Sequence, residues 1–361
     1  MSIHETASPG DDAPRLDIVV NNYNYAEYLR HAVDSALAQT YPETRVIVVD
    51  DGSTDESRDI IRSYGNRVLA VLKDNGGQAS ALNAGLARCT GRYVLFLDAD
   101  DALAPDAAAR IVATFATDSR LARVHFRQRI MDAEGRDTGA LSPPPRLPLA
   151  RGDLRRQTLR SPFDGAWLPT SGNAFRTAML RHIAPIPERE YGRLGADWYL
   201  VHVSSLLGHV GAIDDPLGWY RVHAENGFTK SGASLDLDHL TQTVHYARLT
   251  RGHLHRTARR LGIEHDPERM ASMCDVANRT LLRRLAVDRP TDDSRLGLLR
   301  LGARASAGRR DIGPVMKTVF LTWLATALLA PRPLVGGLGE LFLFPERRSA
   351  INGLLGALHR S

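Results

Sequence analysis

The chain has few of the residues that several common kinds of site require. Among its 361 residues are two cysteines, Cys89 and Cys274, which are too few and too far apart in sequence for a disulfide framework or a zinc site. It has three lysines, and none of them lies in a phosphate-binding Walker motif. The glycine-rich dinucleotide fingerprint is also missing after the first apolar run. The chemistry is therefore expected to rest on other side chains.

Long hydrophobic runs are missing as well. The best candidate, residues 319–330, is about 12 residues long and stops before Pro331 and Pro333, whereas a membrane-spanning helix needs about 18 or more. Residues 1–14 are polar and lack the basic start and apolar stretch of a signal peptide, so we expect them to be disordered. These observations exclude a protein with several membrane spans and favour a cytoplasmic location.

Charge is unevenly distributed along the chain. The formal net charge is +5, but the segment from Tyr246 to Arg310 holds 15 arginines and 7 acidic residues. A basic segment can attract anionic lipid or nucleic acid, but this one lacks the interleaved aromatic residues of a nucleic-acid platform. We expect no nucleic-acid partner and favour a solvated helical face. Peripheral contact with the inner face of the cell membrane is a further hypothesis, and core packing or a homodimer is the alternative for the apolar segments that follow.

The remaining composition is that of a globular protein, with 43% hydrophobic and 24% charged residues. From residue 16 to about residue 126, short apolar runs alternate with amphipathic segments, which indicates strand–helix units of an α/β fold with a mostly parallel sheet. Turns and loops are expected over residues 131–148, and consecutive helices from residue 235 onward. The expected strands are Ile18–Val20, Val46–Val49, Val68–Leu72 and Tyr93–Leu97, and the expected helices between them include 27–38 and 78–88.

An acidic pair follows the second apolar run. Asp50 and Asp51 stand where a strand should end, and ligands of open α/β sheets bind at the carboxyl ends of strands. Ser53 and Glu56 have the spacing of a helix capping box, which is the alternative for that part of the segment. The two adjacent carboxylates precede this cap and repel each other unless a cation or a hydrogen-bond donor meets them. We therefore predict that they contribute to a ligand site.

A second acidic cluster follows the fourth apolar run. Asp98 and Asp100 alternate along extended backbone, so their carboxylates share one face and can converge on one ion. Mg²⁺ and Mn²⁺ bind through one or two carboxylates together with phosphate oxygens and water. Helix capping by Asp100 or Asp101 is the alternative. Because two acidic clusters repel the phosphates of a nucleotide, the pattern predicts a divalent cation, Mn²⁺ or Mg²⁺, between them.

Four ordered segments together carry a resemblance to a known family. They are Leu-Asp-Ile-Val-Val-Asn-Asn-Tyr-Asn-Tyr at 16–25, Asp-Asp-Gly-Ser-Thr-Asp at 50–55, Asn-Gly-Gly-Gln-Ala-Ser-Ala-Leu-Asn-Ala-Gly at 75–85, and Leu-Asp-Ala-Asp-Asp at 97–101. They resemble the motifs of the inverting, non-processive family 2 glycosyltransferases over about residues 15–225. The resemblance implies a GT-A fold, a Rossmann-like, mostly parallel sheet flanked by helices. It places a glycosyltransferase domain at 15–230, with a donor half at about 15–126 and an acceptor half at about 127–230, before a helical C-terminal region at 231–361.

The resemblance also implies roles for single residues. It implies that Asp197 is the base that deprotonates the acceptor hydroxyl, although Ala196 stands where the family carries a first acid. It implies that Asp100 holds the metal between the two donor phosphates, and that His223 approaches the metal or the diphosphate. The expected donor-binding residues are Asn22, Tyr23, Asp50, Asp51, Gln78, Asn83, Asp98 and Arg221, and the expected acceptor-binding residues are Trp167, Ser171, Gly172, Asn173 and Trp198. The alternatives are a helix N-cap for Asp197, a structural role for His223 and core packing for the tryptophans.

The expected reaction is transfer of a sugar from a nucleotide-diphosphate donor, with a UDP-sugar favoured. Its acceptor is expected to be a hydroxyl of a glycan or a lipid-linked molecule in envelope or exported polysaccharide synthesis. A processive synthase is disfavoured because the sequence lacks spanning helices and a Gln-x-x-Arg-Trp motif. A catalytically inactive module that binds a nucleotide or glycan is the alternative supported by Ala196. A membrane-surface adaptor built on the basic helices is a third hypothesis.

Overall fold

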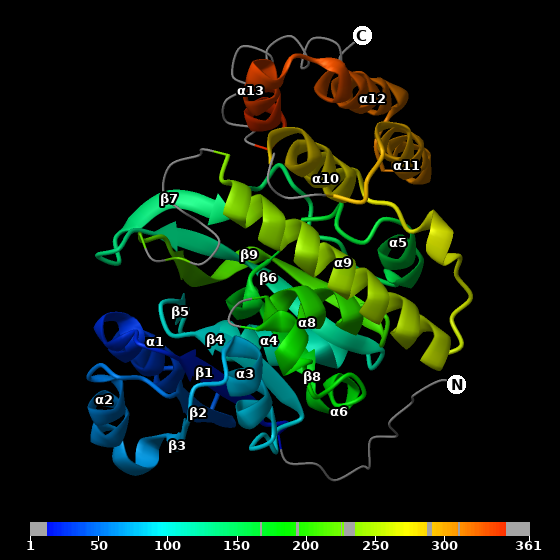
Figure 1. The fold of residues 1–361 in the computed structure, drawn as a ribbon. Helices are drawn as coiled ribbons and strands as arrows, with labels where there is room; N and C mark the ends of the chain where they lie inside the picture. Colours follow the sequence, from blue (N-terminus) through cyan, green and yellow to red (C-terminus); the bar gives the residue numbers. More distant parts are fainter. Residues whose placement is uncertain are drawn as a thin grey trace. The chain divides into compact units, whose positions relative to one another are not determined.

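The computed structural model describes residues 13–166, 168–192, 195–224, 226, 235–286, 291–309 and 311–343 (Figure 1). The chain divides into two compact units. Unit 1 comprises Met1–Leu159, Gly165–Gly227 and Leu249–His265, and unit 2 comprises Arg160–Asp164, Phe228–Arg248 and Asp266–Ser361. The long helix α9 (Leu237–Arg260) contributes residues to both units. Among the described residues, no helix combines the length and the apolar character that crossing a membrane requires.

Unit 1 is built on a mixed sheet in the order β3-β2-β1-β4-β8-β6-β9-β5, with β7 paired to β6. The first four strands are parallel to one another, and β6 is also parallel to β9, whereas β8, β5 and β7 pair with antiparallel neighbours. The strands are β1 (Leu16–Asn22), β2 (Thr44–Asp51), β3 (Leu69–Lys73), β4 (Tyr93–Asp98), β5 (Ala102–Leu103), β6 (Leu121–Met131), β7 (Asp137–Ser142), β8 (Asn173–Arg176) and β9 (His209–Arg221). The four predicted apolar runs overlap β1 to β4, and the expectation of an α/β fold is confirmed.

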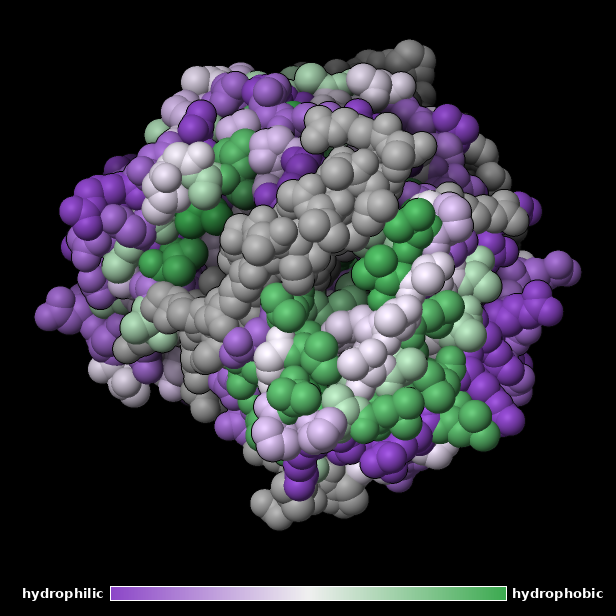
Figure 2. Space-filling view, turned by 90° about the horizontal axis from the view of Figure 1, so that it is seen from above, coloured by the Kyte–Doolittle hydropathy of each residue, from purple (hydrophilic) through white to green (hydrophobic). Residues whose placement is uncertain are grey.

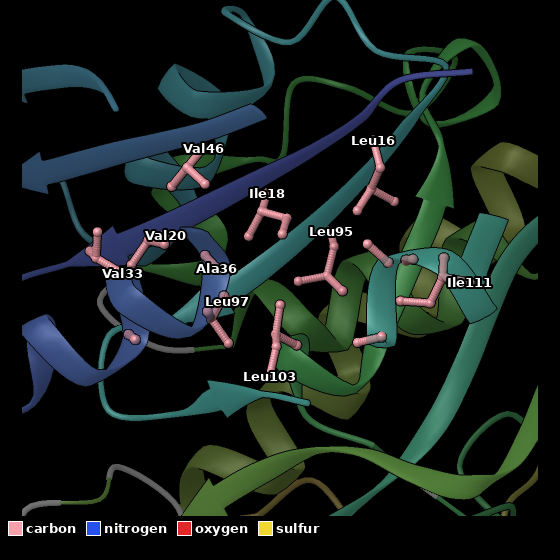
Figure 3. Close-up of a cluster of buried hydrophobic side chains, with 14 of the residues drawn as sticks. Leu16, Ile18, Val20, Val33, Ala36, Val46, Leu95, Leu97, Leu103 and Ile111 are labelled. Carbon is pink, nitrogen blue, oxygen red and sulfur yellow. The ribbon is translucent and has the colours of Figure 1, made fainter. Parts of the chain in front are cut away.

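Helices cover both faces of β1, β2 and β4, which explains why these strands are continuously apolar rather than alternating, whereas β3 at the edge of the sheet is largely exposed. On one face, Ile18, Leu95 and Leu97 pack with Val33 of α1 and Ile111 of α4 (Figure 3). On the other face, α3 packs closely. The helices of unit 1 are α1 (Ala26–Leu37), α2 (Ser57–Ser63), α3 (Gln78–Leu86), α4 (Ala107–Thr117), α6 (Thr177–Leu180), α7 (Glu188–Tyr191) and α8 (Ala196–Ser204), with η1 (Gly65–Arg67) and η2 (Thr170–Gly172), and α5 (Arg155–Arg160) ends at the boundary with unit 2.

The close packing of α3 depends on a glycine. A Cβ atom built on Gly85 would lie 2.3 Å from Cγ1 of Val19 in β1, a distance that real Cβ contacts do not reach. The helix can therefore approach the strand only because this side chain is missing. The segment that carries Gln78 is in this way fixed beside the ends of β1 and β2.

The expectation of loops over residues 131–148 is partly wrong. The strand β7 pairs antiparallel with β6, and the turn between them closes with a hydrogen bond from the Gly135 amide to the Asp132 carbonyl (3.0 Å). The turn residues were recognisable in the sequence, but the short exposed strand that follows has no apolar alternation to announce it. Loop structure does follow β7, around Pro143 to Pro145.

Unit 2 is a helical assembly, as expected for the C-terminal region. Its helices are α10 (Met273–Leu285), α11 (Arg295–Gly308), α12 (Pro314–Leu329) and α13 (Arg332–Leu343), with η3 (Pro267–Arg269) before them. Val276, Leu298, Phe320 and Leu324 form its core, and Gly302 lets α11 approach α12 because a Cβ there would lie 2.2 Å from Leu324. The interior is therefore formed by one side of each helix.

Candidate active site

The polar ends of three neighbouring strands meet at the carboxyl edge of the sheet. Because β1 lies between β2 and β4, Asn22 pairs in register with Asp50, and Asn21 pairs with Asp98. The acidic clusters predicted from positions far apart in sequence therefore lie at one edge. Each carboxylate at this edge has a different set of partners. These partners show which carboxylates hold the fold together and which are placed to meet a ligand.

Asp50 and Asp51 are both buried, and each meets a cation. Asp50 accepts hydrogen bonds from Nε of Arg58 (2.7 Å), the Ser53 amide (3.1 Å) and Nδ2 of Asn22 (3.1 Å). Asp51 lies 2.6 Å from Nζ of Lys73. The repulsion expected between two adjacent acids is thus relieved within the protein, since a nearby cation favours the charged carboxylate.

Asp51 also shapes the turn before α3. It accepts hydrogen bonds from the amides of Gly76 (3.1 Å) and Gly77 (2.6 Å). Gly52, the next residue, has φ +82°, and a Cβ there would lie 2.5 Å from the Asn75 amide nitrogen. The glycine therefore permits the contact between two motifs that lie about 25 residues apart in sequence.

The predicted capping box is wrong. Ser53 accepts hydrogen bonds from Nδ2 of Asn22 (3.1 Å) and from the Asn24 amide (2.9 Å), so its hydroxyl joins β1 to β2. Helix α2 begins later, at Ser57, and Glu56 makes no side-chain cap. The Ser53 hydroxyl oxygen, which the local pattern assigned to a helix cap, instead accepts hydrogen bonds from the end of β1 and from the segment after it.

Asp98 is held by polar side chains from three elements. Its carboxylate accepts hydrogen bonds from Nδ2 of Asn21 (2.8 Å), Nε2 of Gln78 (3.4 Å) and Oγ of Ser171 (3.5 Å). The Ser171 hydroxyl in turn accepts from the Asp98 amide (3.0 Å). Burial and the neighbouring charge of Asp100 raise the pKa of Asp98 to about 6. The structure therefore brings together Gln78, Asp98 and Ser171.

Asp100 faces His223. Nε2 of His223 lies 3.1 Å from Oδ2 of Asp100, and Nδ2 of Asn226 donates to the same oxygen (3.4 Å). The His223 ring packs against Tyr28, with 4.9 Å between ring centroids, and against Tyr25 at 5.7 Å. Asp100 is not a helix cap, because α4 begins at Ala107 and takes Asp106 as its N-cap.

Asp98, Asp100 and Asp101 are crowded at this edge, and each ionised carboxylate opposes ionisation of its neighbours. Burial, followed by the charges of Asp100 and Asp98, raises the pKa of Asp101 well above its usual range. Among the described residues no group of three or more His, Cys, Asp and Glu side chains is arranged to hold a metal ion. Asp100 and His223 offer one oxygen and one nitrogen, a set that fits a hard cation bound mainly through phosphates and water. The crowding of carboxyls and this pair of ligand atoms are both compatible with Mg²⁺ or Mn²⁺.

Asp197 lies in the first turn of α8 and is buried, with 7% of its surface exposed. Its Oδ1 accepts a hydrogen bond from the Trp198 amide (2.8 Å). Burial, with a contribution from the charge of Asp98, raises the pKa of Asp197 to about 7. The N-cap of the helix is Gly195, and Asp197 makes no capping bond across the first turn. A carboxyl with such a pKa can accept a proton near neutral pH.

Arg221 is placed differently from a free phosphate ligand. It is 3% exposed, and its guanidinium donates to the Asp100 carbonyl (2.8 Å), the Ala133 carbonyl (2.9 Å) and Nδ1 of His31 (2.8 Å). Its Cζ lies 4.7 Å from the centroid of the Tyr28 ring. The Arg221 amide donates to Oδ1 of Asp101 (2.9 Å). We call the segment of Asp100 and Asp101 the acidic loop. Arg221 thus joins the acidic loop to α1 and to the β6–β7 turn.

Some predicted residues lie apart from the Asp98–Asp100 cluster. Asn83 donates to the Ile186 carbonyl and to Glu188, both at 2.9 Å, and Tyr23 is 37% exposed. Trp167 lies outside the described residues. Trp198 is mostly buried and stacks on His202 with 5.7 Å between ring centroids.

The rest of the predicted acceptor segment is fully buried. Asn173 accepts from Nη1 of Arg123 (2.8 Å) and donates to the Pro169 carbonyl (2.8 Å). Gly172 is buried, and a Cβ there would lie 3.1 Å from Oε1 of Gln128. These two residues therefore pack inside the protein and do not face an open surface.

Several residues of the site were not selected from the sequence. Asn21 stood within a segment that carried the resemblance, and Asn226 lies three residues after the predicted His223, so a polar side chain close to the expected site was the available signal. Tyr28, His31, Arg58 and Lys73 gave no such signal. Arg58 and Lys73 bind Asp50 and Asp51, whereas His31 and Tyr28 contact Arg221 and His223, and all these contacts depend on how α1, α2 and β3 pack on the sheet. Local sequence patterns do not encode these contacts.

The fold and site together define a glycosyltransferase of the GT-A type. The model of the Glycosyl transferase family 2 matches residues 17–179. An uncharacterized glycosyltransferase of a Nostoc species is 33% identical over 224 residues, which are 61% of this chain and 68% of that protein. The chain belongs to the family 2 glycosyltransferases, and the expectation of a sugar transferase with a nucleotide-sugar donor is supported.

Three further comparisons cover either a short part of the sequence or the fold alone. The chondroitin synthase of Pasteurella multocida is 41% identical over 125 residues, which are 34% of this chain and 13% of the synthase. An uncharacterized glycosyltransferase of Rickettsia prowazekii is also similar, with 46% identity over the matched part. That part is 30% of the length of the Rickettsia protein. The crystal structure of S. aureus TarS in complex with UDP-GlcNAc matches 91% of each chain with a TM-score of 0.51 and 15% identity, which shows the shared fold.

Proposed function

We propose that this glycosyltransferase moves a sugar, with inversion, from a UDP-sugar to a hydroxyl of a glycan or lipid-linked acceptor. The observation that carries the proposal is the placement of Asp98, Asp100 and Asp197. The first two carboxylates lie at one strand edge, and the charge of Asp98 reaches the buried Asp197. A site of this kind offers a binding region for a cation and diphosphate beside a proton acceptor of suitable pKa.

The donor side is proposed to lie along the ends of β1, β2 and β4. Asn22, Tyr23, Asp50 and Asp51 would surround the base and ribose, although Asp50 and Asp51 act largely by fixing the strand ends through Arg58 and Lys73. Asp98, held by Asn21, Gln78 and Ser171, would orient the ribose or the donor sugar. Asn83 and Arg221 would support this side at a distance through their contacts with protein groups.

A divalent cation, Mn²⁺ or Mg²⁺, is proposed to be held by Asp100 and His223. When bound, such a cation supplies charge stabilisation for the leaving nucleoside diphosphate. Tyr25 and Tyr28 pack against the His223 ring, and Asn226 donates a hydrogen bond to Asp100. The two metal-ligating side chains are therefore positioned before the nucleotide sugar binds. Prior positioning lowers the reorganisation that the reaction requires.

Asp197 is proposed to take the proton of the acceptor hydroxyl as that oxygen attacks the anomeric carbon. The attack comes from the face opposite the leaving diphosphate, so the configuration is inverted and no covalent sugar–enzyme intermediate forms. Trp167, Ser171, Gly172, Asn173 and Trp198 would form or support the acceptor side. The acceptor is proposed to belong to envelope or exported polysaccharide synthesis, and the enzyme to act without processivity in the cytoplasm.

The test is an assay of the purified protein with a panel of nucleotide sugars and Mn²⁺, beginning with UDP-GlcNAc. Thermal shift measures donor binding, because a ligand of the native state raises the melting temperature. Release of nucleoside diphosphate measures turnover. We expect Asp100→Ala to lose cation-dependent donor binding and Asp197→Asn to retain binding but lose turnover. Asp106→Asn, which changes a surface acid beside Arg110, is the control and should match the unchanged protein.

The second candidate function is a catalytically inactive module that binds a nucleotide or glycan. It is favoured by one observation, the buried Ala196 beside Asp197, where the family carries an acid. Binding of a nucleotide sugar with no release of diphosphate, with or without a panel of glycan acceptors, would establish this alternative. Turnover that depends on Asp197 would exclude it.

A further inference from the structure

Helix α12 in unit 2 exposes an uncharged face along its whole length. Lys317 is its one charged residue in 16. We call apolar stripe the set of exposed residues that recur every three or four positions, Val315, Thr318, Val319, Thr322, Thr326 and Leu329. This spacing places them on one side of the helix, over about 21 Å. Phe320, Leu324 and Leu328, on the other side, fill the core of unit 2.

The threonines of the apolar stripe do not prevent it from contacting an apolar environment, because their hydroxyl groups can bond within the helix. The Thr318 hydroxyl donates to the Pro314 carbonyl (3.1 Å), and the Thr326 hydroxyl donates to the Thr322 carbonyl (2.8 Å). Such bonds to the preceding turn satisfy a hydroxyl within the helix and let it face an apolar environment. The stripe therefore has little need of water at these positions.

The surface beside this stripe is hollowed and apolar. A shallow groove of about 660 Å³ is lined by Leu321, Thr322, Ala325, Thr326, Leu329 and Ala330. Leu329 is 73% exposed, and Leu334, at the start of α13, is 60% exposed. Figure 2 shows hydrophobic side chains gathered on this side of the molecule. Single exposed leucines are common, but a continuous uncharged face indicates an interaction surface.

Arginines gather at the C-terminal end of the apolar stripe. Arg284 donates to the Ala327 carbonyl (3.1 Å) and to the Ala330 carbonyl, and the Arg332 side chain donates to the Arg284 carbonyl (3.0 Å). Burial and the charges of Arg295, Arg332 and Arg283 lower the pKa of Arg284. We call these four residues the arginine cluster. Within the described part of the chain, no carboxylate forms an ion pair with any of them.

The charge around the apolar stripe selects among its possible occupants. From Arg295 to Leu334 the chain has seven basic residues and one acidic residue, Asp311. A symmetric dimer through this face would bring two basic surfaces together, since both copies present the same patch. An anionic bilayer offers negative headgroups for the arginine cluster and an apolar layer for the stripe.

We propose that the apolar stripe and the arginine cluster dock unit 2 on the surface of an anionic lipid bilayer. The helix lies on the surface and does not cross it, because its buried side belongs to the core of unit 2. This inference does not depend on the transferase reaction, so the two can fail separately. If both hold, the enzyme works at the surface where a lipid-linked acceptor is found.

The test is co-sedimentation of the full chain with vesicles. One set contains phosphatidylcholine alone, and the other contains two parts phosphatidylcholine and one part phosphatidylglycerol. We expect binding to the anionic vesicles at low salt and its loss as ionic strength rises. Arg283→Gln with Arg295→Gln should weaken the binding roughly thirtyfold, from the contribution of each basic residue near an anionic surface. Val319→Glu with Leu329→Glu should abolish it.

Leu147→Glu is the matched control, because Leu147 is equally apolar and 45% exposed but lies in unit 1. It should bind vesicles as the unchanged protein does. Arg295, Val319, Leu329 and Leu147 are exposed and Arg283 is half-buried on the helix surface, so the variants should keep melting temperatures close to that of the unchanged protein. The proposal is overturned if the unchanged protein stays in the supernatant at low salt, or if the stripe variant and the control bind equally. A protein that is dimeric in light scattering and becomes monomeric in the stripe variant would also overturn it, in favour of a second copy.

Discussion

At the scale of single residues, the acids of the site fall into two groups according to their partners. Asp50 and Asp51 are neutralised by Arg58 and Lys73 and hold the turns. Asp98 and Asp197 are bonded to amide, hydroxyl and backbone groups, with no cationic side chain among their partners in the described part of the chain, and burial raises the pKa of each. The first group keeps the strand ends in place, and the second group is available for chemistry.

The raised pKa of Asp197 predicts how activity depends on pH. A base must be unprotonated, so kcat/KM should fall about tenfold per pH unit below about pH 7 and level off above it. Asp197→Asn should lower kcat by about 10² to 10⁴-fold with little change in donor affinity. Initial rates over pH 5.5 to 8.5 measure both. A rate that stays constant from pH 5.5 to pH 7 would argue that another group is the base.

Arg221 is predicted to act by positioning. Arg221→Lys would leave carbonyl groups of the acidic loop and the β6–β7 turn without a donor, since an ammonium cannot reproduce the fork of a guanidinium. We expect a loss of about 2 to 4 kcal/mol of stability in urea unfolding, together with weaker Mn²⁺ dependence of donor binding. Arg136→Lys is the control, because its side chain is 74% exposed on the same turn. Equal effects in both variants would contradict the assignment.

At the scale of elements, the parallel strands could be predicted from the sequence and their surroundings could not. The apolar runs predicted β1, β2 and β4 because burial on both faces leaves a continuous apolar signal, and acids mark the ends of β2 and β4. The apolar run of β3 was also recognisable, although this edge strand is largely exposed. The order of the strands then brought Asn21, Asp98 and Asn22 together. The strand β7 and the true start of α2 were missed, since one is short and exposed and the other depends on the contact of Ser53 with Asn22.

The turn after β2 gives a prediction at this scale. Gly52→Ala should cost about 1 to 3 kcal/mol, because the residue has positive φ and its Cβ would meet the Asn75 backbone at 2.5 Å. Gly65→Ala is the matched control, since Gly65 also has positive φ, +57°, but no atom lies within 4 Å of its Cβ position. Urea unfolding of both variants separates backbone strain from the clash. A cost for Gly52→Ala no larger than that for Gly65→Ala would show that the turn can relax.

At the scale of the whole molecule, the buried acids tie stability to pH. The folded protein raises the pKa of Asp197 from 3.8 to about 7, so between these values the folded state binds more protons than the unfolded chain. Stability from this group is full below about pH 4 and is lost as pH rises to about 7. The Asp197→Asn variant has no ionisable group at this position, so its stability does not fall with pH for this reason.

Asp197→Asn should therefore become progressively more stable than the unchanged protein as pH rises. We expect the difference in unfolding free energy to grow by about 2 to 3 kcal/mol between pH 5 and pH 8. Taking this difference cancels the opposite contribution of His125 and His202, whose pKa values burial lowers to about 3 and about 4. Urea unfolding at four pH values measures it. A constant difference would place the Asp197 carboxyl in an environment that leaves its pKa unchanged.

The contacts of Arg221 constrain how new variants of this enzyme can be made. Arg221 comes from β9, yet it binds His31 of α1 and the Asp100 carbonyl, and β6 itself runs from Leu121 to Met131 across the expected border of the donor and acceptor halves. A chimera that joins the first half of one relative to the second half of another at residue 126 would cut a strand and exchange only one partner of each pair. Grafting must instead carry Arg221, α1 and the acidic loop together as one cassette.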